Sequence, residues 1–180
     1  MELVANIFGI AAVVIFALSF QSKTRSKIIS LNILSRVFYI AQYIFLFAFE
    51  GAAFDLIGAF ATIPARQKDM GIVKRYKTLI LIAIFGTIVI AGALLYKDLW
   101  SILPVVGVSL EIAALWVSEE KKIRIISFLS QPFWLTYNLR FLALGSAFGN
   151  AFTMISIIIA LYRFRKSDIK GRENAEFSGE

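Results

Sequence analysis

The sequence contains no cysteine and no histidine among its 180 residues. Without cysteine the chain can form no disulfide and offers no thiolate nucleophile. Without histidine it lacks the usual imidazole base and the most common zinc or haem ligand. We therefore expect neither a metal nor another cofactor.

Charged residues are also scarce. They make up 17% of the chain, whereas 59% of the residues are hydrophobic and the mean hydropathy is +0.77. Soluble globular domains do not have this composition, which predicts an all-α integral membrane protein with the lipid bilayer as its main partner. The net charge of +7 comes from basic residues between the apolar segments, so we expect no nucleic-acid partner.

Seven apolar segments are long enough, or nearly so, to cross a bilayer, for which about 20 residues are needed. They lie near residues 3–20, 28–48, 51–65, 78–96, 99–117, 123–143 and 146–163. Nothing basic precedes the first segment and no small-residue cleavage pattern follows it, so we interpret it as a span and not as a signal peptide. The polar tail 167–180 is expected to be disordered and cytoplasmic.

Lysine and arginine are distributed unevenly between the two sides that seven spans would define. Of the 19 basic residues, 16 fall in the first, third and fifth connections and in the stretch that follows Tyr162. Lys97 lies on the other side, and Arg36 and Arg140 lie within spans. Because cytoplasmic loops retain basic residues, the N-terminus should be outside and the C-terminus cytoplasmic. Six spans would place one basic connection on the wrong side.

The two ends of the chain also match each other weakly. Shifts of 97 and 98 residues, reconciled by one gap, align KIIS (27–30) with RIIS (124–127), Tyr39 with Tyr137, GAAF (51–54) with GNAF (149–152), and Lys68 with Lys166. Spans one to three then correspond to spans five to seven, and the extra fourth span makes the two copies parallel. The predicted fold is therefore seven transmembrane helices in two parallel three-helix bundles joined by a linker helix, a 3+1+3 plan.

This plan divides the chain into four parts. Residues 1–68 are the first repeat, 69–98 contain the linker helix, 99–166 are the second repeat and 167–180 are the tail. The fourth span, TLILIAIFGTIVIAGALLY, has no charged residue and two threonines, so it can face lipid on all sides. We expect it to pack at the periphery.

Four other spans carry polar or small residues along one helical face. These residues are Asn32, Ser35, Arg36, Tyr39 and Tyr43; Gly51, Asp55, Gly58 and Thr62; Pro104, Gly107 and Glu111; and Ser127, Gln131, Trp134 and Asn138. In lipid such faces point inward. Two interpretations are open: the residues hold helices together by close packing and hydrogen bonds, or they line a water-accessible cavity between the two halves.

Two pairs of opposite charges are expected within the spans. Arg36 and Glu111 lie about 13 Å and about 9 Å from the cytoplasmic ends of their helices, so they are predicted to form a buried pair. Asp55 and Arg140, near the outer ends of their spans, are a second candidate pair; the alternative is that Arg140 extends to the headgroups. With Asp55 and Glu111 as the only acids inside spans, acid–base catalysis has few candidates, and we do not expect an enzyme.

The order of LPVVG (103–107), WLTYN (134–138) and GNAF (149–152), followed by a basic cluster, resembles the YgjV-like family of bacterial inner-membrane proteins. That family is similar to the wider MtN3-like group, which comprises the SWEET sugar carriers, the PQ-loop carriers and the PnuC vitamin carriers and shares the 3+1+3 plan. The resemblance implies a multi-pass protein of the bacterial inner membrane. It leaves open whether the chain forms a homo-oligomer.

The resemblance also implies roles for individual residues. In SWEET-like carriers Trp and Asn line a central solute site, and prolines act as hinges. By this resemblance Trp134 and Asn138 would contact a solute, with Asn150 as a further candidate. Pro104 and Pro132 would be the hinges.

Residue spacing adds one more candidate to the solute site. Gln131, Trp134 and Asn138 are three and four residues apart, which places them on one helical face. An indole ring beside amide donors and acceptors suits a small polar solute with a flat or apolar side. Together with the resemblance to SWEET-like carriers, which implies alternating access, this predicts a carrier of a small polar solute. The alternative is a membrane-embedded binding, signalling or scaffold protein of the same fold that does not transport.

Overall fold

The computed structural model describes residues 1–21 and 25–178, and these ranges are helical apart from short connections, which confirms the all-helical prediction. The helices are α1 (Glu2–Gln21), α2 (Arg25–Phe45), α3 (Phe49–Arg66), α4 (Gly71–Arg75), α5 (Lys77–Leu94), the 3₁₀ helix η1 (Leu99–Ser101), α6 (Ile102–Trp116), α7 (Glu120–Arg140) and α8 (Leu144–Ser178). All but α4 and η1 are long, and each long helix coincides with one predicted apolar segment, with α8 extending beyond its own.

The end of α8 differs from the disordered tail expected for residues 167–180. The helix continues to Ser178, well past its apolar part. The stretch contains no proline, and it includes several Lys, Arg, Glu and Ala residues, which have high helix propensity. Because the preceding apolar turns already nucleate the helix, each further residue adds one backbone hydrogen bond without a new nucleation cost.

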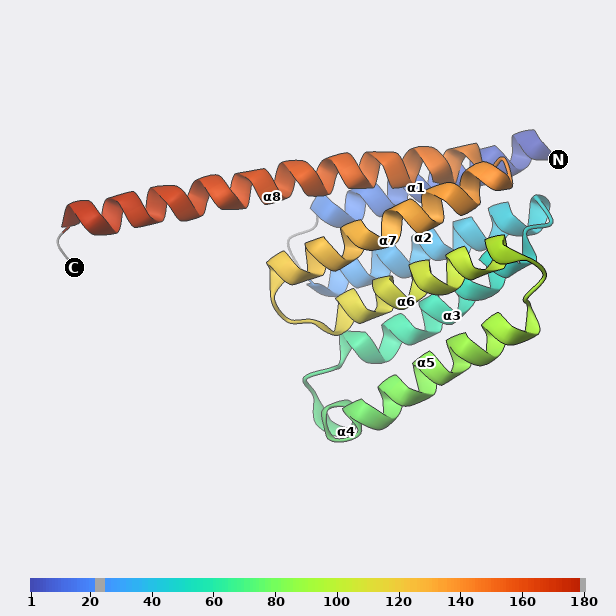
Figure 1. The fold of residues 1–180 in the computed structure, drawn as a ribbon, viewed down its shortest axis with the longest axis horizontal. Helices are drawn as coiled ribbons and strands as arrows, with labels where there is room; N and C mark the ends of the chain where they lie inside the picture. Colours follow the sequence, from blue (N-terminus) through green and yellow to red (C-terminus); the bar gives the residue numbers. More distant parts are fainter. Residues whose placement is uncertain (22–24, 179–180) are drawn as a thin grey trace.

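Six long helices form a closed bundle of two layers, α1–α3 and α6–α8. Within the layers α2 contacts α1 and α3, and α7 contacts α6 and α8; at the edges α1 meets α8 and α3 meets α6. Consecutive long helices run in alternating directions (Figure 1). The fifth helix, α5, lies outside this bundle against α3 and α6. Ile88 is the one buried residue described for α5, so the helix has the peripheral position expected of it.

The α2–α3 and α7–α8 connections have the same backbone geometry. Phe47 and Leu142 have positive φ angles of 57° and 54°. The hydrogen bonds that close the two helix ends, both 2.9 Å long, run from Ala48 N to Tyr43 O and from Ala143 N to Asn138 O. A left-handed residue at this point allows the chain to turn while a C-terminal carbonyl keeps a donor. Both connections therefore reverse the chain within three residues.

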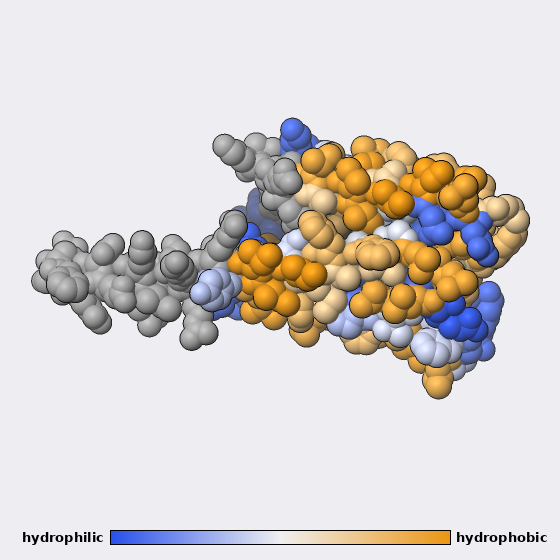
Figure 2. Space-filling model, turned by 90° about the horizontal axis from the view of Figure 1, so that it is seen from above, coloured by the Kyte–Doolittle hydropathy of each residue, from blue (hydrophilic) through white to orange (hydrophobic). Residues whose placement is uncertain are grey.

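The outer surface is largely apolar. Figure 2 shows hydrophobic residues over most of the body, with hydrophilic residues gathered toward its ends. On α5, for example, Leu79, Val89 and Leu94 are 62%, 66% and 80% exposed. By length and composition, Lys77–Leu94 and Leu99–Trp116 qualify as membrane spans within the described residues, and Glu2–Leu18, Ile29–Phe45 and Leu144–Ile159 are shorter apolar helices. An exposed apolar surface of this extent suits lipid rather than water.

Lys68 connects the two layers at the end of α3. Its side chain is buried, and its Nζ donates to the carbonyl oxygens of Trp116 and Val117, at 3.3 and 2.6 Å, and to Ser118 Oγ at 3.1 Å. These carbonyls belong to the C-terminal end of α6, where a positive charge is favourable. Lys68 thus fixes the end of α3 to the end of α6.

Candidate functional site

A small polar cavity lies between the two layers. Its volume is about 40 Å³, measured as the space open to the centre of a water molecule. At the roughly 10–15 Å³ needed for one water, it holds about three. All six helices of the bundle contribute to its lining. The charged residues of the lining, within the part of the chain that the structure describes, are Arg36, Asp55 and Glu111.

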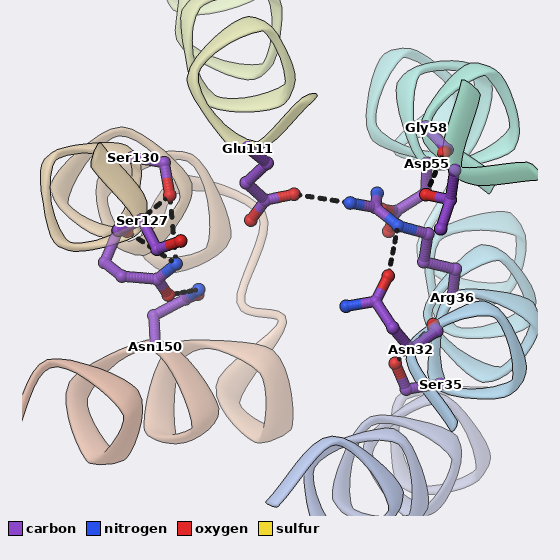
Figure 3. Close-up of polar contacts among 11 residues, drawn as sticks. Asn32, Ser35, Arg36, Asp55, Gly58, Glu111, Ser127, Ser130 and Asn150 are labelled. Atoms are coloured by element: carbon purple, nitrogen blue, oxygen red, sulfur yellow. Dashed lines mark hydrogen bonds and ion pairs between the residues drawn. The ribbon is translucent and has the colours of Figure 1, made fainter. Parts of the chain in front are cut away.

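Arg36 joins three helices at this cavity. The side chain, 4% exposed, donates from Nη1 to Asp55 Oδ1 at 2.7 Å and from Nη2 to Glu111 Oε2 at 2.6 Å (Figure 3). Its Nε donates to Asn32 Oδ1 at 3.3 Å. The expected Arg36–Glu111 pair is therefore present, and it links α2 with α6 of the opposite layer. Each hydrogen-bonded ion pair offsets part of the cost of removing these charges from water.

Gly58 makes room for the guanidinium. A Cβ atom at this position of α3 would lie 2.4 Å from Nη1 of Arg36. Any other residue would therefore force the guanidinium away from the backbone of α3. The polar stripe of α3, in which Gly58 lies one turn after Asp55, thus supplies both a partner for Arg36 and the space that the pair occupies.

The expected Asp55–Arg140 pair is not formed. Asp55 lies six residues inside α3, about 9 Å from its start, whereas Arg140 is the last residue of α7. The two side chains are therefore at different depths. Arg140 is exposed, and its guanidinium carbon lies 5.9 Å from the centroid of the Phe141 ring. Asp55 instead shares Arg36 with Glu111.

The opposite layer contributes an uncharged chain of hydrogen bonds. Tyr43 Oη donates to Asn138 Oδ1 at 2.7 Å, and Asn138 Nδ2 donates to Asn150 Oδ1 at 2.7 Å. Asn150 Nδ2 then donates to Gln131 Oε1 at 2.9 Å, and Gln131 Nε2 donates to Ser130 Oγ at 3.0 Å. The three amide residues predicted for the solute site thus line the same cavity and hold one another in place.

Trp134, the fourth predicted solute residue, also lines the cavity. It is 4% exposed, stacks on Tyr43 with ring centroids 6.4 Å apart, and meets Tyr137 edge-on at 6.2 Å. Its Nε1 is buried with no hydrogen-bond partner among the described residues. A Cβ at Gly107 would lie 2.8 Å from that nitrogen, so the indole packs directly against α6.

The two hinge candidates occupy different kinds of position. Pro104 is the third residue of α6, within the first turn, where a missing amide costs no helical hydrogen bond. It therefore does not interrupt α6. Pro132 lies in the middle of α7 and is exposed, and its carbonyl accepts a hydrogen bond from Thr136 Oγ1 at 2.8 Å. Pro132 alone has the mid-helix position that a hinge requires.

The helix boundaries of the two layers match at a spacing that the sequence did not suggest. α7 begins and ends 95 residues after α2, and α8 begins 95 residues after α3. Phe47 and Leu142, the left-handed residues of the two connections, are also 95 apart. The shifts of 97 and 98 read from the sequence exceed this spacing by two and three residues. Three residues are close to one helical turn, so the shift of 98 keeps residues near the same helical face, whereas the shift of 97 does not.

Side-chain contacts follow the same spacing. Arg36–Asp55 in one layer corresponds to Gln131–Asn150 in the other. Ser35 Oγ donates to Asn32 O at 2.8 Å, and Ser130 Oγ donates to Ser127 O at 2.7 Å. Across the layers, Gln42 accepts from Ser146 Oγ, and the Gly51 amide donates to Tyr137 Oη at 2.9 Å. In each case both partners shift by 95 residues.

The structure offers no obvious place for a metal ion. Across the residues it describes, no group of three or more Asp, Glu, His or Cys side chains is arranged to hold one. Asp55 and Glu111, the two carboxylates of the cavity, are both held by Arg36.

Comparison with known proteins adds one assignment. No curated protein and no solved structure matches the chain. A family model described as a bacterial inner membrane protein matches residues 3–168, which include every residue that lines the cavity. That match covers far more than half of the sequence and agrees with the apolar outer surface. The chain therefore belongs to the Imp-YgjV family of bacterial inner membrane proteins.

Proposed function

We propose that this chain is a seven-span carrier that moves a small polar solute across the bacterial inner membrane by alternating access. The observation that carries the proposal is the polar cavity that lies between two layers with matching geometry. In carriers built from repeats, the solute site lies at the interface of the repeats, near the middle of the bilayer.

The proposed topology follows from the direction of the helices. The long helices alternate in direction, so the α1–α2, α3–α5 and α6–α7 connections lie at one end of the molecule (Figure 1). These connections with the helix ends that flank them, and the segment after Tyr162, contain 16 of the 19 Lys and Arg residues. The end that holds them is cytoplasmic in this proposal, and the N-terminus is outside.

The matching contacts support two parallel repeats with α5 as the linker. In this proposal α1–α3 and α6–α8 are copies related by an axis along the membrane normal, with a spacing of 95 residues in the second and third helices of each copy. Exchanging the copies turns the α3–α6 contact into the α8–α1 contact, and both contacts are present. Two copies that rock against each other would expose the cavity to each side in turn.

A protein of the same fold that does not transport is the second candidate. The observation in its favour is that Gln131, Asn138 and Asn150 satisfy one another's amides. Residues arranged in this way also serve as packing between helices. We propose no catalytic role in either case, because both carboxylates of the cavity are engaged by Arg36.

Uptake into liposomes tests the proposal. The purified chain would be screened by thermal shift against small polar solutes, because a ligand that binds the folded state raises its stability. Solutes that give a shift would then be assayed for protein-dependent uptake. We expect uptake that saturates with solute concentration and is lost in Asn150→Ala, while Thr87→Ala, at an exposed position of α5, retains it. Binding without uptake would favour the second candidate.

A further inference from the structure

The charges that line the cavity do not balance. Two carboxylates, Asp55 and Glu111, face one guanidinium, Arg36, which leaves one excess negative charge in the described lining. The nearest other buried cation, Lys68, is committed to the carbonyl oxygens at the end of α6. An unbalanced charge at this depth is costly, so a cation that enters the cavity would relieve that cost.

The carboxylate of Glu111 has an oxygen free to receive such a cation. Its Oε2 accepts the hydrogen bond from Arg36, and within the described part of the chain Oε1 accepts none. The side chain remains 21% exposed, compared with 7% for Asp55. Figure 3 shows Glu111 extending from α6 toward Arg36, with Ser127 and Ser130 on its other side. Glu111 lines the cavity and is more exposed than Asp55, so its free oxygen is open to a ligand.

Aromatic rings complete the surroundings. Tyr39, Tyr43 and Trp134 line the same cavity, and the ring faces of tyrosine and tryptophan attract cations. A carboxylate oxygen accepts N–H donors, whereas aromatic faces accept N⁺–CH₃ or N⁺–H groups. A bare inorganic ion needs several oxygen ligands, but an ammonium group uses both features of this lining.

We infer that the cavity binds one small monovalent ammonium-type cation between Glu111 and the aromatic rings. This inference rests on the proposed function, because it names the class of solute for the same site. The volume of about 40 Å³, room for about three waters, suits a ligand of the size of ammonium or methylammonium.

Binding of methylammonium tests the inference. The full chain in lipid nanodiscs would be titrated with methylammonium chloride at constant ionic strength, with NaCl and KCl as parallel titrations, and the shift in Tm recorded. We expect methylammonium to raise the Tm of the wild type. Glu111→Gln removes the excess charge and keeps an acceptor for Arg36, so it should weaken binding at least about tenfold. Glu119→Gln, the same substitution at an exposed position, should bind normally.

A second variant covers the case in which Glu111→Gln does not fold. Gln131→Glu adds a carboxylate to the cavity and keeps the oxygen that accepts from Asn150. We expect it to bind methylammonium about tenfold more tightly than the wild type. No gain in affinity would contradict the inference.

The remaining outcomes separate the inference from the proposed function. Equal shifts with NaCl or KCl, or no shift with any cation, would overturn the ammonium assignment; the last result would mean that a proton balances the charge. Saturable uptake of a neutral solute without methylammonium binding would leave the carrier proposal standing and reject the inference. Methylammonium binding without uptake of methylammonium into liposomes would support the inference and reject the carrier proposal.

Discussion

The two layers of the molecule place different chemistry on the same scaffold. In the first layer a guanidinium and a carboxylate, Arg36 and Asp55, join α2 to α3. At the corresponding places in the second layer two neutral amides, Gln131 and Asn150, join α7 to α8. The positions of the contacts follow from backbone geometry, because the helix boundaries and the connections match. The side chains then decide that the wall formed by α2 and α3 has a charged contact and the wall formed by α7 and α8 has a neutral one, while Glu111 on α6 adds a charge to the second layer.

The difference also concerns how each layer reaches across the cavity. Arg36 binds Glu111 of the opposite layer, whereas the amide chain reaches α2 through the neutral bond between Tyr43 and Asn138. Removing a charged partner leaves an uncompensated charge, but removing a neutral partner leaves one unsatisfied polar group. The two walls should therefore differ in their sensitivity to mutation.

Arg36→Ala is expected to have the largest effect. It leaves two carboxylates without a partner and should lower the free energy of unfolding by about 3–5 kcal/mol, measured by denaturant titration in detergent. In a cycle with Glu111→Ala, the double variant should be less destabilised than the sum of the single variants. Effects that add to within about 0.5 kcal/mol would show that the two residues are not coupled.

Gln131→Ala tests the neutral wall. The loss of its bonds to Asn150 and Ser130 should cost about 1–3 kcal/mol of unfolding free energy, less than Arg36→Ala in the same titration. A cost equal to or larger than that of Arg36→Ala would refute the proposed difference between the walls. Asn150→Ala, which removes the other partner, should give a similar value.

Gly58→Ala tests the space beneath the charged pair. The added methyl group would meet Nη1 of Arg36 at 2.4 Å, so we expect a loss of about 1–3 kcal/mol from overpacking. Gly86→Ala on α5 is a matched control, because a Cβ there meets nothing within 4 Å. That variant should be neutral or up to about 1 kcal/mol more stable, since alanine favours helix. Equal responses of the two variants would show that Gly58 has no special role.

Lys68→Met examines one of the two edges where the layers meet. It keeps the apolar stem of the side chain but removes the charge that caps α6, so a loss of about 1–2 kcal/mol is expected. Lys74→Met, at an exposed position of α4, should change stability by less than about 0.5 kcal/mol. Thermal unfolding of both variants in one detergent would distinguish them. A Lys68→Met protein as stable as the control would show that the capping contact adds nothing.

The sequence predicted what depends on periodicity and depth. Apolar length located the long helices, and matched depth brought Arg36 to Glu111. The same reasoning failed for Asp55 because it assumed that each acid has its own base, whereas one guanidinium has enough donors for two carboxylates. It also treated Pro104 as a hinge, although the actual start of α6 places this residue in the first turn.

The spacing of 95 between the helix boundaries of the two layers was not found from the sequence for a different reason. Apolar segments align by chance, and three residues are close to one helical turn, so a shift of 98 keeps residues near the face that a shift of 95 gives them. The clearest markers of the true spacing are the left-handed residues Phe47 and Leu142. Neither is glycine or asparagine, the residues that usually indicate such a conformation, so nothing in the sequence pointed to them.

The position of α5 makes the two edges of the bundle mechanically unequal. It packs against both α3 and α6 from outside and so holds these two helices together at their edge of the bundle. At the opposite edge α1 and α8 meet at a glycine contact, where a Cβ on Gly145 would lie 2.9 Å from the backbone of Gly9. Any opening of the cavity should therefore pivot at the α3–α6 edge, which α5 holds, and separate α1 from α8. Such an opening would give a solute a lateral as well as an axial path into the cavity.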